Sequence, residues 1–381
     1  EVPQGAIRLN TDSQRLEFFA QDRWYEMATD VPTLDGGARG LAYRAGGSNT
    51  IDVITIPTSG NATDFGNATT TAGGRHTAAS RTRSIAAGGG TPTRINTIEF
   101  STFSTTGNGQ DFGDLTVVGA GGAQMGMSNQ TRGVFGGRTS PSNVNTIDYI
   151  TIAQTGTAVD FGDMSTANNP NGGTGMCNST RGVYNHGSTP SIVSTIDYVI
   201  ISSDGGANDF GDTTVAKKET NRLSNATRGL IFGGTITPET NVIEFITIAT
   251  TGSAKGFGSL LQAARGMGGV GNATRGLMAS GYNGSSYINT IEFVTIATTG
   301  DSEDFGDLSG ARMNTAAVGS STRAVFGGGY TSNPHINSLE YVEFATKGNV
   351  TDFGDFSVGG GDRGATSVSY THLTLPTSDL V

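Results

Sequence analysis

The feature that most constrains this 381-residue chain is an internal repeat whose copies begin 47 to 49 residues apart. The triplet Asp-Phe-Gly begins at residues 64, 111, 160, 209, 304 and 352, and Gly-Phe-Gly takes its place at residue 256. A second marker, an aliphatic residue followed by an acid, begins at residues 51, 98, 147, 196, 243, 291 and 339. Two markers in register over seven copies predict an array of equal units, such as a solenoid or a propeller.

Each copy predicts four short strands, because runs of β-branched and aromatic residues alternate with turn residues. In the seventh copy these strands cover 313–319, 323–329, 338–345 and 351–356. A short turn rich in Asn, Ser and Thr joins the first two strands, and a Thr-Gly turn joins the last two. A four-stranded antiparallel meander cannot bury its own faces, so neighbouring copies must stack. The sequence therefore predicts an all-β fold, a seven-bladed β-propeller with four-stranded antiparallel blades.

The residues of the repeat resemble those of the kelch repeat. A glycine doublet such as Gly136 and Gly137 ends the second strand, an aromatic such as Tyr149 lies on the third, and the Phe of the triplet lies on the fourth. Kelch repeats usually carry Trp at the last position, where this chain has Phe in every copy, and the doublet is broken in copies four and six. The resemblance implies a kelch-like propeller.

Three segments are expected along the chain. Residues 1–30 predict a short β-hairpin, in which Ile7 and Leu9 alternate with polar residues, and 31–370 form the propeller. The first copy lacks its first strand, so we expect residues 363–370 to fill the innermost position of the first blade and close the ring. Residues 371–381 follow no repeat pattern and resemble a translated adapter tail without function.

The N-terminal hairpin resembles a segment of bacteriophage tail-fibre and receptor-binding proteins that precedes their distal domain. The similarity covers about 25 residues and includes the single tryptophan, Trp24, which we expect to stabilise the hairpin rather than bind a ligand. This resemblance implies a tail or fibre protein located in the virion tail, outside the cell.

Several functional classes are disfavoured by composition. A net charge of −10 repels phosphate backbones, which argues against nucleic acid, and no apolar run approaches the roughly 20 residues that span a bilayer. The acids repeat with the fold, the only cysteine is Cys177, and His76, His186 and His335 lie in distant copies. We therefore predict no catalytic residues, no metal and no cofactor, although the paired Asp residues of Asp-Phe-Gly-Asp leave a calcium site open.

Strand direction divides the repeated charges between two faces of the ring. An arginine begins the second strand and the Asp of Asp-Phe-Gly begins the fourth, so both lie toward the face of the short turns. The acids that start the third strand lie toward the opposite face. We expect these charges to form a structural lattice between blades. The arginines are Arg83, Arg132, Arg181, Arg228, Arg275 and Arg323, and the third-strand acids are Asp52, Glu99, Asp148, Asp197, Glu244, Glu292 and Glu340.

The connections between the second and third strands differ most from copy to copy, and variable loops on a rigid scaffold usually carry recognition. The rings of copies six and seven could stack on sugars or on a partner surface, and the arginines of copies two and three offer forked donors. Solvated loops without a ligand are the alternative for each residue. The predicted ligand-binding residues are Arg94, Arg138, Tyr282, Tyr287, Tyr330 and His335.

These patterns predict a non-catalytic binding or structural propeller of a phage-type tail or fibre protein that recognises a host-surface glycan or protein. Other virion tail proteins are expected partners, and residues 1–30 could join copies of the chain into a homo-oligomer. The alternative is a kelch-like binding protein that a bacterium secretes or displays on its surface. Nucleic acid and membrane are not expected partners.

Overall fold

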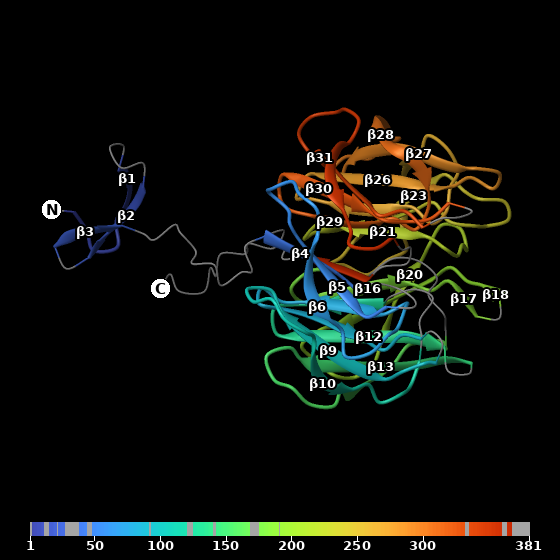
Figure 1. Ribbon diagram of the computed structural model, residues 1–381, viewed down its shortest axis with the longest axis horizontal. Helices are drawn as coiled ribbons and strands as arrows, with labels where there is room; N and C mark the ends of the chain where they lie inside the picture. The colour runs from blue at the N-terminus through green and yellow to red at the C-terminus, as the bar shows by residue number, and fades with distance from the viewer. Residues whose placement is uncertain are drawn as a thin grey trace.

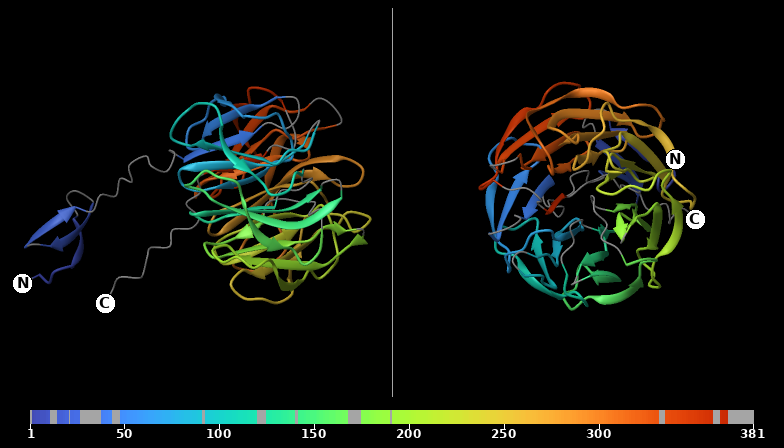
Figure 2. Two further views of the ribbon diagram at one scale, coloured as in Figure 1. Left: turned by 90° about the horizontal axis from the view of Figure 1, so that it is seen from below. Right: turned by 90° about the vertical axis from the view of Figure 1, so that its right-hand side faces the viewer.

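The computed structural model describes residues 2–10, 15–20, 22–26, 38–43, 48–90, 93–119, 125–139, 142–167, 175–189, 191–331, 335–359 and 364–367. The predicted fold is confirmed: seven four-stranded antiparallel sheets surround a common axis as the blades of a closed propeller (Figures 1 and 2). In this part of the chain no helix is long and apolar enough to cross a membrane.

The blades follow one another around the ring in chain order (Figure 2, right). Within each blade the strand order runs outward from the axis. Blade 1 contains β33 (Gly364–Ser367), β4 (Arg39–Tyr43), β5 (Thr50–Thr55) and β6 (Thr63–Asn67). Blade 2 contains β7 (His76–Ala79), β8 (Arg83–Ala87), β9 (Thr97–Thr102) and β10 (Gln110–Asp114). Blade 3 contains β11 (Met125–Ser128), β12 (Arg132–Thr139), β13 (Asn143–Thr151) and β14 (Val159–Asp163).

Blade 4 contains β15 (Met176–Cys177), β16 (Arg181–Asn185), β19 (Thr195–Ile200) and β20 (Asn208–Asp212), with an inserted hairpin of β17 (Ser188–Thr189) and β18 (Ser191–Ile192). Blade 5 contains β21 (Asn221–Ser224), β22 (Arg228–Phe232), β23 (Val242–Thr247) and β24 (Lys255–Ser259). Blade 6 contains β25 (Gly268–Gly271), β26 (Arg275–Tyr282), β27 (Tyr287–Thr295) and β28 (Glu303–Arg312). Blade 7 contains β29 (Ala316–Gly319), β30 (Arg323–Gly327), β31 (Ser338–Glu343) and β32 (Thr351–Asp355).

The ring closes as predicted. Strand β33 pairs antiparallel with β4, with Gly364 opposite Tyr43 and Ser367 opposite Gly40. The C-terminal strand thus completes the blade that the N-terminal part of the chain begins. The other residues of the expected 363–370 segment, and the tail 371–381, lie outside the described residues.

The N-terminal segment contains the predicted hairpin and one strand more. Strand β1 (Ile7–Asn10) pairs with β2 (Arg15–Ala20), which also pairs with β3 (Arg23–Glu26). Trp24 lies on β3, where its ring packs edge-on against Phe19 at 5.2 Å and lies 4.2 Å below the guanidinium of Arg8. Trp24 therefore stabilises this small sheet, as expected.

Aromatic pairs fill the core of the blades. In blades 2 to 7 the ring of the third strand meets the buried Phe of the repeated triplet edge-on, with centroids 5.8–6.1 Å apart, as in Tyr149 and Phe161. Burial of one such Phe stabilises the fold by about 1.5–3 kcal/mol. The buried Phe of the triplet recurs in all seven blades, so its packing gives every blade the same geometry around the axis.

Backbone hydrogen bonds join each blade to the next at the triplet. In all seven junctions the carbonyl of the triplet Phe accepts an N–H from a glycine in the short turn of the following blade, at 2.6–2.9 Å. The approach is close enough to require glycine in the triplet itself. Gly66 has φ +143°, and a Cβ built on it would lie 2.4 Å from the carbonyl oxygen of Gly107.

The repeated arginines also bridge the blades, but not through the expected charge lattice with the triplet Asp. Arg228 lies over the ring of Phe245 in its own blade, at 4.6 Å, and donates to the carbonyl of Ile296 in the next blade at 3.0 Å. Equivalent bonds occur at all seven junctions, and in six blades the guanidinium lies 4.1–5.1 Å from the third-strand ring. The seventh arginine is Arg39, which begins β4 as the other six begin the second strands of their blades, although the sequence prediction did not include it.

The triplet Asp has a local role instead. In five blades its Oδ1 accepts the N–H of the glycine two residues later, at 2.8–3.1 Å, as Asp64 does from Gly66. The Arg–Asp part of the predicted lattice is therefore wrong, because the Asp turns back onto its own exposed strand.

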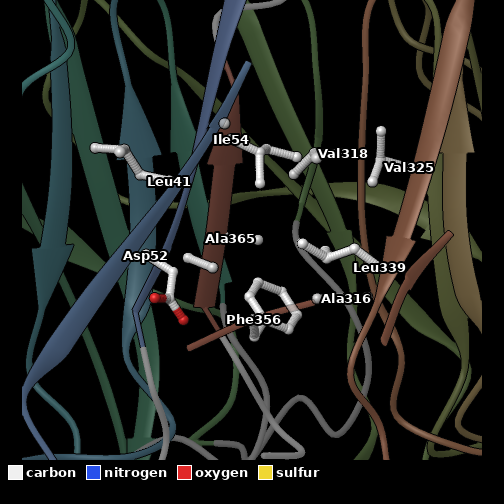
Figure 3. Close-up of a pocket in the computed structure, with 12 residues that line it drawn as sticks. Leu41, Asp52, Ile54, Ala316, Val318, Val325, Leu339, Phe356 and Ala365 are labelled. Carbon is white, nitrogen blue, oxygen red and sulfur yellow. The ribbon is translucent and has the colours of Figure 1, made fainter. Parts of the chain in front are cut away.

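The seam between blades 7 and 1 contains a small cavity (Figure 3). Leu41, Asp52 and Ile54 line it from blade 1, and Leu339 and Phe356 line it from blade 7. Its volume of about 20 Å³ has room for a single water molecule. The cavity therefore belongs to the packing of the closed ring and is too small for an organic ligand.

We predict that Arg228→Ala lowers the free energy of unfolding by about 2 kcal/mol, because it removes a charge-assisted hydrogen bond and a cation–π contact. The stability of Arg228→Lys should lie between those of the wild type and Arg228→Ala, because an ammonium group lacks the forked donors of the guanidinium. Urea unfolding measures the difference, and Arg81→Ala, an exposed turn residue, is the control. Equal losses for Arg81→Ala and Arg228→Ala would contradict the role of the inter-blade bond.

We also predict that a chain ending at residue 359, which lacks β33, melts roughly 10 °C or more below the full chain because β4 becomes an unpaired edge. A chain that ends at residue 370 retains β33 and should melt with the full chain. Differential scanning calorimetry compares the three, and equal melting of the two truncations would refute closure by β33.

Candidate functional site

The two faces of the propeller differ in what they carry. Strand β4 begins, and β33 ends, on the face of the short turns, because the two strands run antiparallel with Ser367 opposite Gly40. Both chain connections of the propeller therefore leave from this short-turn face. The variable connections between second and third strands lie on the opposite face, which we call the loop face.

Four of the six predicted ligand-binding residues come together on the loop face. The ring centroids of Tyr282 and Tyr287 are 5.4 Å apart, those of Tyr287 and Tyr330 are 6.1 Å apart, and those of Tyr330 and His335 are 6.2 Å apart. The three tyrosines are half-buried and His335 is exposed. We call these four residues the aromatic cluster; it spans blades 6 and 7.

Local structure explains why the cluster forms. Strands β26 and β27 continue further toward the loop face than their counterparts in blade 5, so their hairpin carries Tyr282 and Tyr287 outward as a cross-strand pair. The turn between them is held by Asn283, whose Oδ1 accepts the N–H groups of Ser285 and Ser286 at 3.1 and 2.8 Å. The Tyr282 hydroxyl donates to the Gly284 carbonyl at 3.0 Å. These bonds present the rings in fixed positions.

A charged group borders the cluster. The Arg265 guanidinium lies 5.2 Å from the Tyr282 ring and forms ion pairs with Glu219 at 2.6 Å and Glu239 at 3.1 Å. Burial opposes the charge, but the hydrogen bonds and charges of the two glutamates raise the pKa of Arg265 above its ordinary value. Two carboxylates and one guanidinium leave this border with one negative charge.

Arg265 and Glu219 were not predicted, because only the connections between second and third strands were expected to carry the site; Glu239 lies in such a connection of blade 5 but was not singled out. Arg265 and Glu219 lie in the connections between blades, which reach the same face. Because both kinds of connection lie on the loop face, the sequence could have indicated that residues between blades also reach the site.

The two predicted arginines lie elsewhere. Arg94 is exposed on blade 2, away from blades 6 and 7. Arg138 was expected in an exposed loop, which is wrong: it lies within β12, which continues past a bulge to pair Arg138 with Val144. Its side chain is 0% exposed and forms an ion pair of 2.8 Å with Asp148. Burial lowers the pKa of Arg138 and the charge of Asp148 opposes this effect. Contact of either arginine with a ligand stays a prediction.

Five of the third-strand acids form buried pairs with a basic side chain that is not one of the repeated arginines, which the repeat pattern did not predict. Their basic partners come from two places. The glutamates pair with a residue just before the first strand, and the aspartates pair with one at the end of the second strand or just after it. The pairs are Arg75–Glu99, Arg138–Asp148, His186–Asp197, Lys217–Glu244 and Arg312–Glu340, with every side chain at most 4% exposed.

The three histidines of the described residues lie apart. His76, His186 and His335 lie in blades 2, 4 and 7, and burial raises the pKa of the Cys177 thiol. Across the described ranges, no three His, Cys, Asp or Glu side chains gather as metal ligands would. What the loop face does offer is a strip of rings beside hydrogen-bonding charges, an arrangement that suits recognition.

No protein-family model matches the chain, and no curated protein matches it in sequence. The resemblances to kelch repeats and to phage tail fibres therefore rest on the repeated residues and on the N-terminal hairpin of this chain.

We predict that His76 makes the fold sensitive to mild acid. Its imidazole is fully buried beside Phe135, and neither ring nitrogen has a hydrogen-bond partner among the residues that the structure describes. Burial lowers its pKa from 6.5 to about 3, and the charge of Arg138 acts in the same direction. Between pH 6.5 and 3 the unfolded chain binds a proton that the folded chain does not. As the pH falls through this range, His76 should therefore lower the free energy of unfolding by about 1.4 kcal/mol for each pH unit.

Urea unfolding between pH 7 and 4 tests this effect. His76→Phe should lose less stability than the wild type as pH falls, whereas the exposed control His335→Phe should follow the wild type. Parallel curves for wild type and His76→Phe would show that His76 has no such role.

Proposed function

We propose that this propeller is a non-catalytic recognition domain of a phage-type tail or fibre protein that binds a host-surface glycan through the aromatic cluster. One observation carries the proposal: the cluster lies on the loop face, opposite the face from which both chain connections leave. A domain attached in this way displays its variable loops outward, toward a surface that the rest of the protein approaches.

The chemistry of the cluster supports a glycan. The apolar C–H faces of pyranose rings stack on aromatic rings, and half-buried tyrosines give them a flat and rigid surface. Sugar hydroxyls then need donors and acceptors at the edge of that surface. Arg265, Glu219 and Glu239 supply both kinds of group within one network.

Charge narrows the expected glycan. The border of the cluster has one net negative charge and the chain as a whole has −10. Anionic polysaccharides would be repelled by both fields. We therefore expect neutral or amino-sugar glycans to bind best.

The phage setting is supported by the N-terminal resemblance and by the position of the attachment. Under this proposal, residues 1–30 connect the propeller to other virion tail proteins or to further copies of the chain. A propeller displayed on a bacterial surface would use the same cluster, and only its attachment would differ.

A glycan array tests the proposal with the wild type and the triple variant Tyr282→Ala/Tyr287→Ala/Tyr330→Ala. Loss of stacking should weaken binding at least about tenfold. The matched triple Phe variant keeps the rings and should retain most of the binding. Equal melting temperatures of the variants would show that the fold is unchanged.

Two results would count against a glycan site: full binding by the triple Ala variant, or no glycan bound while a host-surface protein binds the cluster.

A further inference from the structure

Blade 6 breaks the rule of buried ion pairs. Glu292 occupies the third-strand acid position, and its side chain is 0% exposed. Among the residues that the structure describes, no cationic side chain pairs with it. Its Oε2 accepts the backbone N–H of Leu261 at 2.9 Å and the hydroxyl of Ser302 at 2.5 Å, while its Oε1 has no hydrogen-bond partner in the described part of the chain.

In other blades, two positions supply the basic residue that pairs with the third-strand acid. In blade 6 both positions hold small residues. Lys217 and Arg312, which pair with glutamates, each lie four residues before the first strand of their blade. Ala264 takes this place in blade 6 and is fully buried. The neighbouring Arg265 points away to Glu219 and Glu239.

The second position holds Ser280. It lies five residues after Arg275, as His186 lies five residues after Arg181, and His186 bonds the blade 4 acid at 2.8 Å. Ser280 is 0% exposed, and its hydroxyl has no hydrogen-bond partner within the described ranges. Its φ is +64°, where four other blades have glycine with φ between +60° and +67°. A serine is uncommon in that conformation, so the hydroxyl is present despite a backbone that favours glycine.

Three observations therefore meet in blade 6: an uncompensated buried carboxylate, an unbonded buried hydroxyl, and a small residue where a Lys or Arg would lie. We propose that a small monovalent cation, of the sodium or potassium class, binds between Glu292 and Ser280 and replaces the missing side-chain cation. One carboxylate balances one positive charge, which disfavours a divalent ion. Carboxylate and hydroxyl oxygens are the hard donors that such ions prefer.

The electrostatics of the site agree with this assignment. Burial raises the pKa of Glu292 and the nearby Asp304 adds to the effect, although the bonds from Ser302 and Leu261 oppose it. A bound cation relieves this cost by compensating the charge. Because Ser280 and Glu292 lie on β26 and β27, the ion would hold together the base of the hairpin that carries Tyr282 and Tyr287.

Thermal unfolding in sodium, potassium and tetramethylammonium chloride at equal ionic strength tests the site, because the large cation cannot enter it. The wild type should melt roughly 2–4 °C higher when a small cation is present well above its dissociation constant. Glu292→Gln should lose this difference. Ala264→Lys reproduces the Lys217–Glu244 ion pair of blade 5, so its melting temperature should also not depend on the small cation. This variant should melt at least as high as the wild type in every salt.

Two outcomes would overturn the proposal. If small cations raise the melting temperatures of the wild type and Glu292→Gln equally, the cations act at the protein surface and not at Glu292. A wild type that ignores the cation, together with Glu292→Gln melting higher in every salt, would show that the carboxyl is simply protonated. If Ala264→Lys does not fold, Ser280→Gly provides the test. Glycine relaxes the backbone at this position but removes the hydroxyl ligand, so small cations should raise its melting temperature less than that of the wild type.

Discussion

The propeller depends on hydrogen bonds that cross from one blade to the next. The seven sheets share no strand pairing, so neighbouring blades are held by side-chain packing and by hydrogen bonds, the most regular of which lie on the short-turn face. One such bond contributes only about 1 kcal/mol, or about 1.5–3 kcal/mol where the guanidinium donates. Their repetition at every junction makes the spacing between blades uniform, and a uniform spacing is what allows the ring to close.

Because these bonds lie on the short-turn face, the loop face is free to vary. Blade 3 extends its second and third strands and buries Arg138, blade 4 adds the hairpin of β17 and β18, and blade 6 projects Tyr282 and Tyr287. Blade 6 is unusual twice, since it carries half of the aromatic cluster and lacks a cation for its buried acid. Both departures from the repeat fall on the same two strands.

Much of the fold could be predicted because the period is a global signal. Seven equal copies allow few architectures, and a missing strand at one end with a spare strand at the other indicates how the ring closes. The positions of individual charges could not be predicted in the same way. Whether Arg138 is exposed depends on a bulge that lets β12 run on, and the partner of Arg228 is a backbone carbonyl, which no residue pattern reveals. The aromatic cluster was accessible because its rings lie in adjacent copies, whereas Arg265 joins it from a connection between blades.

The pairing of β33 with β4 has a consequence for how the chain is made. During synthesis, the strand that covers the inner edge of β4 is the last strand of the propeller to be made, so six complete blades stand beside an open edge until it emerges. The same pairing places the two ends of the propeller next to each other. A circularly permuted chain, joined there and opened in a short turn of another blade, would assemble the first blade from contiguous residues and move the open edge to that other blade.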